Sequence, residues 1–248
     1  MISVIMGVSR YDEYLPQAID SILAQSFRDF EFVIVANGFS CEEIESRILE
    51  VYPDEERVKV IKTHIGQLAH ALNLGINEAC YDYIARMDSD DVAWPDRLER
   101  QFSYLKNNDL DMIGCDLRLI DELGNYLSTR MYPKGKDINK YLSFKNCFAH
   151  NTILIKKSAV LMARGYNSGF NSEDYDLWLR LRRLGVKWDN MSETLVDYRI
   201  HDGSSQRRLL GYAESTALAV REFILDKKLS KLLAIGYHFL KSVFRPRD

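Results

Sequence analysis

The stretch YIARMDSDDVAWP at residues 83–95 places three carboxylates within four residues, directly after an apolar run. The three are Asp88, Asp90 and Asp91. Neighbouring carboxylates repel one another, so their clustering indicates a partner of opposite charge. Hard divalent cations such as Mg²⁺ and Mn²⁺ prefer oxygen ligands, usually carboxylates completed by substrate phosphates. The spacing alone is as compatible with a metal–diphosphate site as with Asp91 helping to cap a helix that opens at Pro95, and a position at the end of a strand in a parallel sheet would favour the metal.

A second acidic group, Ser172-Glu173-Asp174-Tyr175, opens a stretch of helical spacing that ends at Gly185. Taken alone, this group is typical of a helix start, because Ser172 can act as the N-cap and acidic residues in the first turn suit the helix dipole. The catalytic alternative makes one of the two carboxylates a general base at the edge of a cleft. The local pattern favours the helix start.

Two histidines lie in loops that follow apolar segments. His201 follows a predicted strand and precedes a Gly/Ser-rich loop, and His150 lies in CFAHNT. Either imidazole could contact a metal or a phosphate. A lone histidine at a strand end is more often an ordinary polar loop residue, so the pattern by itself favours that interpretation for both.

The residues before the acidic loop alternate apolar, β-branched runs with amphipathic stretches. Strands are predicted over 2–8, 30–36, 57–63 and 82–87, and helices over 14–25, 41–52 and 66–79. Such alternation is typical of βαβ units in a parallel sheet, where ligands bind beyond the carboxyl ends of the strands. The loops after the four strands should therefore share one edge. They are residues 9–10, 37–38, 64–65 and 88–91.

The second half has a different element order. It predicts a helix over 96–108, a hairpin around 122–124, a strand and helix over 152–160, a helix over 172–185 and a strand over 194–201. From about residue 207 the chain is expected to be helical, with a break near 229. The predicted fold is α/β: a mostly parallel, Rossmann-like sheet flanked by helices over residues 1–205, and a C-terminal helical extension over 206–248.

The composition is that of an ordinary globular chain. The 248 residues are 46% apolar, and 33 basic against 36 acidic residues give a net charge of −3, so no basic field indicates nucleic acid. The four cysteines form no CxxC pair, which favours reduced, buried thiols. The N-terminus lacks the basic region of a signal peptide, and no apolar run is long enough to span a membrane. A cytoplasmic protein is expected.

The C-terminal segment is both apolar and basic. Residues 227–247 combine leucines and phenylalanines with lysines at helical spacing. Such a helix can lie in an anionic membrane interface, which would place the protein at the inner face of the cell membrane. The alternative is a helix that packs its apolar face on the domain.

With these segments in view, residues 1–205 resemble a family 2 glycosyltransferase of the GT-A fold. The resemblance rests on four segments in the family's order: residues 2–35, 66–101, 170–185 and 198–205. They read ISVIMGVSRYDEYLPQAIDSILAQSFRDFEFVIV, GQLAHALNLGINEACYDYIARMDSDDVAWPDRLERQ, FNSEDYDLWLRLRRLG and YRIHDGSS. The resemblance implies an inverting hexosyltransferase (EC 2.4) that uses a nucleotide-diphosphate sugar and Mn²⁺ or Mg²⁺, and whose acceptor is a glycan, a lipid-linked glycan or a similar hydroxyl compound.

The resemblance also implies roles for individual residues. Asp90 would coordinate the metal, Asp88 the metal or the ribose, and His201 the metal or the diphosphate, while Asp91 supports the loop. Asp174 would be the general base, with Glu173 beside it. The remaining positions concern the two substrates. Ser9, Asn37, Asn73 and Arg86 would line the nucleotide pocket in the donor half, residues 1–108, and His150 and Trp178 would lie in the acceptor half, residues 109–205.

One segment departs from the family pattern. The family commonly ends its second strand with an aspartate pair before Gly-Ser, and this chain has VANGFS, with Ala36, Asn37 and Phe39 at those places. Asparagine offers a donor as well as an acceptor, so the departure leaves the base of the nucleotide open. Phe39 could stack on the base or serve in the core or a helix staple.

Two functions follow. The first is an active glycosyltransferase of surface polysaccharide synthesis. The alternative is a catalytically inactive GT-A module that binds glycans or assembles with other subunits. A nucleotidyltransferase is a weaker third reading, because GVSRYDEYL contains no Gly-rich basic loop.

Overall fold

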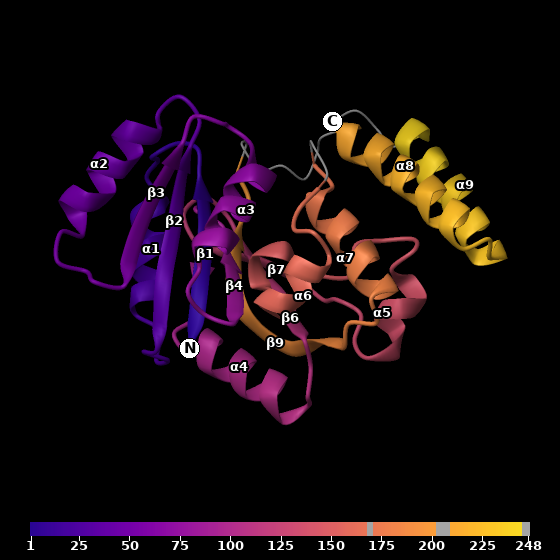
Figure 1. Ribbon diagram of the computed structural model, residues 1–248, viewed down its shortest axis with the longest axis horizontal. Coiled ribbons are helices and arrows are strands. Elements are labelled where there is room, and N and C mark those ends of the chain that lie inside the picture. The colour runs from indigo at the N-terminus through magenta and orange to yellow at the C-terminus, as the bar shows by residue number, and fades with distance from the viewer. Residues whose placement is uncertain (168–170, 202–208, 245–248) are drawn as a thin grey trace.

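The computed structural model describes residues 1–167, 171–201 and 209–244, and the side chains of 209 and 210 are not described (Figure 1). Four parallel strands form the first half of one sheet. They are β1 (Ile2–Val8), β2 (Phe30–Asn37), β3 (Val58–Thr63) and β4 (Tyr83–Met87), in the spatial order β3-β2-β1-β4. The connecting helices are α1 (Leu15–Leu23), α2 (Cys41–Val51) and α3 (Leu68–Glu78). This is the predicted βαβ organisation.

The register shows that these strands end at a common edge. Val8 pairs with Ala36, and Met6 pairs with Met87, so the loops that follow β1, β2 and β4 leave the sheet side by side. Asn37 pairs with Thr63 at the same level. The shared carboxyl edge, on which the candidate site depends, is therefore confirmed.

The second half of the chain extends the same sheet beyond β4. β8 (Leu154–Lys156) pairs antiparallel with β4 and with β6 (Met112–Ile120), and β9 (Trp188–Arg199) pairs parallel with β6 and antiparallel with β5 (Val92–Ala93). The predicted hairpin is formed by β6 and β7 (Tyr126–Arg130). In the described part of the chain most strands therefore run in the direction of β1, as predicted. The helical segments of this half are α4 (Arg97–Asn107), α5 (Lys136–Tyr141), η1 (His150–Thr152), α6 (Lys157–Met162) and α7 (Glu173–Arg183).

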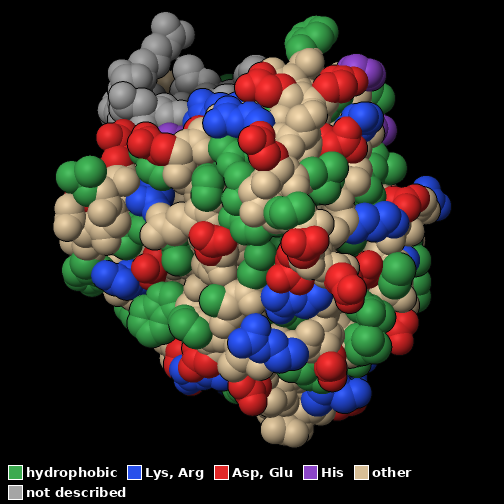
Figure 2. Space-filling model, turned by 90° about the vertical axis from the view of Figure 1, so that its left-hand side faces the viewer, with side chains coloured by type: hydrophobic (Ala, Val, Ile, Leu, Met, Phe, Trp, Pro, Cys, Tyr) green, Lys and Arg blue, Asp and Glu red, His purple; other side chains and the backbone are tan. Residues whose placement is uncertain are grey.

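Hydrophobic side chains are buried on both faces of the sheet. In β1, Val4 and Met6 pack in the cluster that includes α1, α2 and α4. Ile5, which points to the opposite face, packs in the cluster that includes α3, α6 and α7. Burial on both faces explains why the strand reads as an unbroken apolar run rather than an alternating one. The outer surface on the α2 and β3 side intersperses acidic, basic and apolar side chains (Figure 2).

The start of α4 differs from the prediction. Its first residue is Arg97 and its N-cap position is Asp96, so Pro95 precedes the helix instead of opening it. The backbone around Pro95 is used elsewhere, because the carbonyl of Trp94 accepts from Gln25 Nε2 at 2.7 Å and the carbonyl of Pro95 accepts from the amide of Ser26 at 2.7 Å. These bonds join the end of α1 to the segment that leads from the acidic loop into α4.

The C-terminal extension is a helical hairpin of α8 (Leu209–Leu225) and α9 (Leu229–Phe244), with the predicted break at 226–228. Figure 1 shows it beside α7, at the end of the molecule opposite α2 and β3. No helix in the described ranges is long and apolar enough to cross a membrane.

The orientation of α9 is the reverse of that of an ordinary surface helix. Ala234 and His238 are its buried residues, and the side chain of Lys231, one turn before Ala234, is largely covered. His238 Nε2 lies 3.0 Å from the carbonyl of Ser143 and 3.4 Å from Tyr175 Oη. The large apolar side chains face solvent instead. They are Leu229, Leu232, Leu233, Tyr237, Phe239, Leu240, Val243 and Phe244. The alternative in which α9 packs its apolar face on the domain is therefore wrong.

Candidate active site

The acidic loop after β4 is compact. One carboxylate oxygen each of Asp88, Asp90 and Asp91 can be chosen so that all three lie within 4.8 Å of one another. Asp88 forms an ion pair with Arg86, and His201 Nε2 lies 2.8 Å from Asp90 Oδ2. Asp88 and Asp90 remain partly exposed, whereas Asp91 is fully buried. An all-oxygen group of this size fits a hard divalent cation.

Asp91 holds the loop in place. Its Oδ1 accepts from the backbone amide of Arg199 at 2.9 Å, and its Oδ2 accepts from Asn151 Nδ2. Burial raises the pKa of Asp91 well above its ordinary value, and repulsion from Asp88 and Asp90 raises it further. The helix-cap alternative for Asp91 is wrong, since both oxygens contact β9 and η1 rather than the amides of α4.

Arg199 fastens the same loop from β9. Its Nε donates to the carbonyl of Asp90 at 3.0 Å, and its Nη2 donates to Gln17 Oε1 at 2.7 Å. The guanidinium also lies over the ring of Tyr14, 4.6 Å from its centroid. One side chain therefore joins the acidic loop to α1 and to the segment before it.

Two buried arginines support β4 and the acidic loop. Arg97 Nη2 donates to the carbonyl of Arg86 at 2.7 Å, and its Nε donates to Gln101 Oε1 at 3.0 Å. Burial lowers the pKa of Arg97 to about 10. For Arg86, burial also acts to lower the pKa, but attraction to Asp88 outweighs it and the pKa is raised. Arg86 is thus a buried, charged partner of the acidic loop.

The first turn of α7 presents Glu173 and Asp174. Asp174 Oδ2 accepts from Asn146 Nδ2 at 2.6 Å, and its Oδ1 accepts from the backbone amide of Tyr175 at 2.6 Å. Burial raises the pKa of Asp174 in spite of these bonds. Burial, followed by repulsion from Asp174, raises the pKa of Glu173 to about 7. Both groups therefore titrate closer to neutrality than ordinary carboxyls do, as a general base should.

Ser172 does not cap α7 with its side chain, although it occupies the N-cap position. Its hydroxyl donates instead to the carbonyl of Gly211 at 3.0 Å, and the backbone amide of Asn171 donates to Glu214 Oε2 at 3.0 Å. The prediction that Ser172 occupies the N-cap is confirmed, but its side chain does not cap the helix. The segment that leads into the two carboxylates is anchored by α8, which makes the C-terminal extension part of the support of the site.

Arg86 connects the two acidic groups. Its charge opposes the rise in the pKa of Asp88 on one side and of Glu173 and Asp174 on the other. Such an influence on both groups requires that they share one neighbourhood. The structure thus brings together carboxylates that are more than 80 positions apart in the sequence.

Tyr166 lies in this neighbourhood and was missed by sequence reasoning. Its hydroxyl is 2.8 Å from His150 Nε2. Its backbone is clamped by Asn73, whose Nδ2 donates to the carbonyl of Tyr166 and whose Oδ1 accepts from the amide of Tyr166, both at 2.8 Å. Burial, reinforced by Arg86, lowers the pKa of His150 well below its ordinary value, so this imidazole is neutral. Asn73 and His150 thus position Tyr166, and their roles toward substrates stay predictions.

Trp178 does not face the site. Its side chain is fully buried, packed against Phe148 at a ring distance of 5.5 Å and against His150 at 6.1 Å. The residues from Tyr175 to Leu181 on α7 are all buried, so this helix is covered on every side. The prediction that Trp178 contacts the acceptor is therefore corrected to a role in the core.

The predicted nucleotide pocket begins at the ends of β1 and β2. Ser9 is exposed directly after β1, and Asn37 is buried at the end of β2, where its Nδ2 donates to the carbonyl of Val35 at 3.3 Å. Phe39 is fully exposed, which excludes the core and staple alternatives for its side chain. The contacts of Ser9, Asn37 and Phe39 with a nucleotide stay predictions.

The supporting side chains of both acidic groups also escaped the sequence analysis. They are Arg97, Asn146, Asn151, Tyr166 and Arg199. Arg199 could have been noticed as a charged residue beside His201 in a predicted strand. No local signal marks Asn146 or Asn151, because their importance comes from the order of strands in the sheet.

Solved structures with the same arrangement define the class of protein as a GT-A glycosyltransferase fold. S. aureus TarS 1–349 in complex with UDP-GlcNAc superposes with a TM-score of 0.70 at 15% identity, covering 98% of this chain and 81% of that one. The mannosyltransferase PcManGT from Pyrobaculum calidifontis, in complex with GDP-Man and Mn²⁺, superposes with a TM-score of 0.67 at 16% identity, covering 96% and 72% of the two chains.

Sequence comparison identifies the family. The profile of Glycosyl transferase family 2 matches residues 3–165. The O-antigen biosynthesis glycosyltransferase WbnJ of Escherichia coli is 48% identical over 247 residues, which cover 99% of this chain and 97% of that protein. The chain belongs to glycosyl transferase family 2 and is a glycosyltransferase, which confirms the predicted family, fold and enzyme class.

Proposed function

We propose that the protein is a divalent-cation-dependent, inverting glycosyltransferase that builds a surface polysaccharide such as an O-antigen. The single observation that carries the proposal is the pairing, around Arg86, of a cation-sized acidic loop with two carboxylates of raised pKa. The 48% identity with an O-antigen glycosyltransferase over nearly the whole chain supports the polysaccharide assignment. The donor is a nucleoside-diphosphate sugar, a class supported by the ligands of both structural neighbours.

The acidic loop would hold the cation. Asp90 and Asp88 offer partly exposed carboxylates, and His201 offers an imidazole beside Asp90. A bound Mn²⁺ or Mg²⁺ supplies a Lewis acid that neutralises the charge developing on the leaving diphosphate. The protein's own contribution is to oppose protonation of Asp88, through Arg86, and to hold the loop backbone in place, through Asp91 and Arg199.

The first turn of α7 would activate the acceptor. A hydroxyl is a poor nucleophile until a base removes its proton, and in a single displacement that base lies on the face of the sugar opposite the leaving group. Asp174 is assigned as the base, oriented by Asn146 and the amide of Tyr175. Glu173 contacts the acceptor or orients Asp174. In this assignment residues 1–108 bind the donor and residues 109–205 bind the acceptor, beside His150.

A screen of nucleotide-sugars against the whole chain tests the proposal. We expect one UDP-, GDP- or dTDP-sugar to raise the melting temperature in the presence of Mn²⁺ and to do so far less with a chelator present. Hydrolysis or transfer of the same donor is then measured. Donor binding without any turnover would favour the catalytically inactive module. An increase in melting temperature that is the same with and without Mn²⁺ would contradict the metal assignment.

The exposed face of α9 supports a second part of the proposal, contact with an anionic membrane surface. Residues 227–244 contain four lysines and no acidic residue, so the charge beside the apolar face is mainly positive, although Asp226 just before them pairs with Lys228 and Lys231. Two such faces would repel each other in a dimer, whereas acidic lipid headgroups would attract them. A membrane surface would also bring the enzyme to a lipid-linked acceptor.

Sedimentation with liposomes tests this contact. The full chain should sediment with phosphatidylglycerol-containing liposomes at low salt, and the double substitution Leu233→Glu and Leu240→Glu should abolish binding. Leu184→Glu, at an exposed leucine just after α7, is the matched control and should bind normally. A full chain that stays in the supernatant, or a double variant that loses only self-association, would contradict the membrane assignment.

A further inference from the structure

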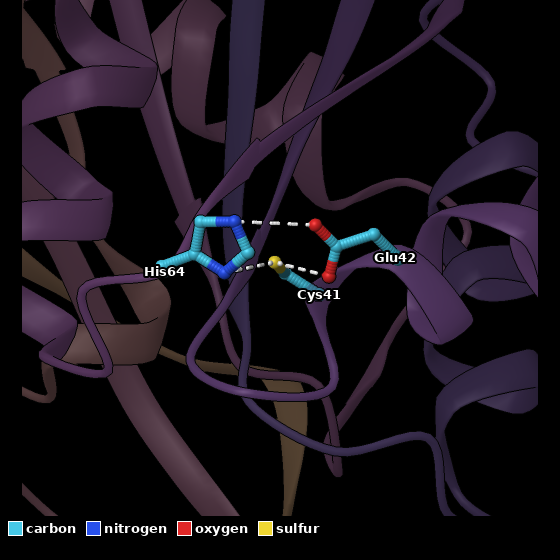
Figure 3. A group of neighbouring side chains, drawn as sticks. All are labelled: Cys41, Glu42 and His64. Atoms are coloured by element: carbon cyan, nitrogen blue, oxygen red, sulfur yellow. Dashed lines mark hydrogen bonds and ion pairs between the residues drawn. The ribbon is translucent and has the colours of Figure 1, made fainter.

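A second group of potential metal ligands lies apart from the acidic loop, between α2 and the loop after β3 (Figure 3). Cys41 Sγ donates to Glu42 Oε2 at 3.1 Å and lies 3.6 Å from His64 Nδ1. His64 Nε2 lies 3.2 Å from Glu42 Oε1. Figure 3 shows the three side chains pointing toward one another, with Cys41 and Glu42 on α2 and His64 on the facing loop.

The distances suit a tetrahedral ion. One donor atom from each residue can be chosen so that all three lie within 4.8 Å of one another. Zinc bonds of about 2.3 Å to sulfur and about 2.0–2.1 Å to nitrogen put the two atoms about 3.5 Å apart at a tetrahedral angle. The observed separation of Cys41 Sγ and His64 Nδ1 is 3.6 Å. Glu42 and His64 have exposed side chains, so small rotations can complete the geometry.

The types of donor differ from those of the acidic loop. A thiolate, an imidazole and a carboxylate form a mixed, borderline-soft set of the kind that Zn²⁺ binds, whereas Mg²⁺ takes oxygen ligands. We infer that Cys41, Glu42 and His64 form a Zn²⁺ site with three protein ligands, whose fourth position is filled by water. Binding replaces the thiol proton of Cys41, which leaves to solvent, so each ion bound releases one proton.

The site would join two loops at the carboxyl edge of the sheet. The amide of Gly38 donates to the carbonyl of Thr63 at 2.9 Å. A Cβ atom at Gly66 would lie 3.3 Å from the Cα of Gly38, so the two backbones are already in close contact. A zinc ion would fasten the first turn of α2 to residue 64 and fix the loop that carries Phe39. This inference does not depend on the transfer reaction.

Titration calorimetry of the full chain with Zn²⁺ tests the site, in excess Mg²⁺ so that oxygen ligands are occupied. We expect one ion per chain and release of one proton. Cys41→Ser and His64→Ala should each weaken binding by more than about tenfold, since even the loss of a ligand's supporting group costs about 10–100-fold. Cys80→Ser, at the exposed cysteine outside the group, is the control and should bind as the unmodified chain does.

Cobalt serves as a second probe. Co²⁺ bound at the site should show a thiolate-to-cobalt charge-transfer absorption that Cys41→Ser abolishes and Cys80→Ser retains. His64→Ala changes an exposed side chain and should fold normally, which keeps the test valid if Cys41→Ser is unstable. Three results would overturn the inference: no Zn²⁺ binding, an affinity of Cys41→Ser and His64→Ala equal to that of the unmodified chain, or loss of binding in Asp90→Ala instead.

Discussion

The acidic loop after β4 and the first turn of α7 both gather carboxylates that burial tends to neutralise, yet their partners differ. Arg86 and His201 contact Asp88 and Asp90. Asn146 and the backbone amide of Tyr175 donate to Asp174. The positive charge of Arg86 opposes protonation of Asp88, whereas the neutral donors on Asp174 leave burial to raise its pKa.

The comparison separates two tasks. In the proposed mechanism, the loop would hold a cation at the leaving group, and the first turn of α7 would accept and release a proton. Arg86 acts on both groups, because its positive charge lowers the pKa of Asp88 and of Glu173, although burial keeps both pKa values raised. The predictions that follow change one group at a time and ask whether the other is affected.

Asp90→Ala should have the largest effect. Loss of this carboxylate removes a cation ligand and the partner of His201, and charge stabilisation worth several kcal/mol corresponds to roughly a 10³-fold loss of transfer. Calorimetry should also show that Mn²⁺ no longer tightens binding of the nucleoside diphosphate. Asp82→Asn, at an exposed aspartate just before β4, should leave both properties unchanged. Metal-dependent donor binding that survives in Asp90→Ala would refute the assignment.

Asp174→Asn should separate transfer from donor binding. The amide keeps a carbonyl oxygen for the amide of Tyr175 but cannot take a proton, so kcat should fall by about 10²–10⁴-fold. Binding of the donor should stay within about twofold, because the cation site is untouched. The control is Asp137→Asn, an exposed first-turn aspartate on α5. Normal turnover in Asp174→Asn would assign the base elsewhere, with Glu173 as the next candidate.

The same two acidic groups show which parts of the fold and of the site could be predicted from the sequence. The β-branched runs of residues 2–8 and 30–36 predicted their strands, and strand polarity alone placed the acidic loop at a shared edge. The acidic start of α7 was equally visible, but its role depended on resemblance to a family. The sequence could place these carboxylates at a strand end and a helix start, because those ends are marked by the residues immediately around them.

The supporting contacts could not be predicted in this way. Arg199 reaches the acidic loop because β9 lies between β6 and β5, an order that no short-range signal specifies. Asn146 lies in an irregular segment before η1 and reaches α7 across 28 positions. The reversed orientation of α9 was likewise invisible, since its helical periodicity is the same whichever face packs on α8.

Glu173→Gln should give the smallest effect and reports on the helix alone. The folded-state pKa of Glu173 is about 7, above its ordinary value of 4.5, so the folded protein binds its proton more tightly than the unfolded chain does. The free energy of unfolding should therefore fall as pH rises from 4.5 to 7 and stay low above that range. Glutamine does not titrate and should flatten this slope, recovering about 1–3 kcal/mol near pH 8.

Urea unfolding at pH 5 and pH 8 measures the difference between the two proteins. Glu43→Gln, an exposed first-turn glutamate on α2, should reproduce the slope of the unmodified chain. If Glu173→Gln leaves the slope unchanged, Glu173 is ionised throughout this range and its carboxylate belongs with the charge-partnered group rather than the proton-accepting one. The contrast between loop and helix would then rest on Asp174 alone, because only its amide donors would still distinguish the two acidic groups.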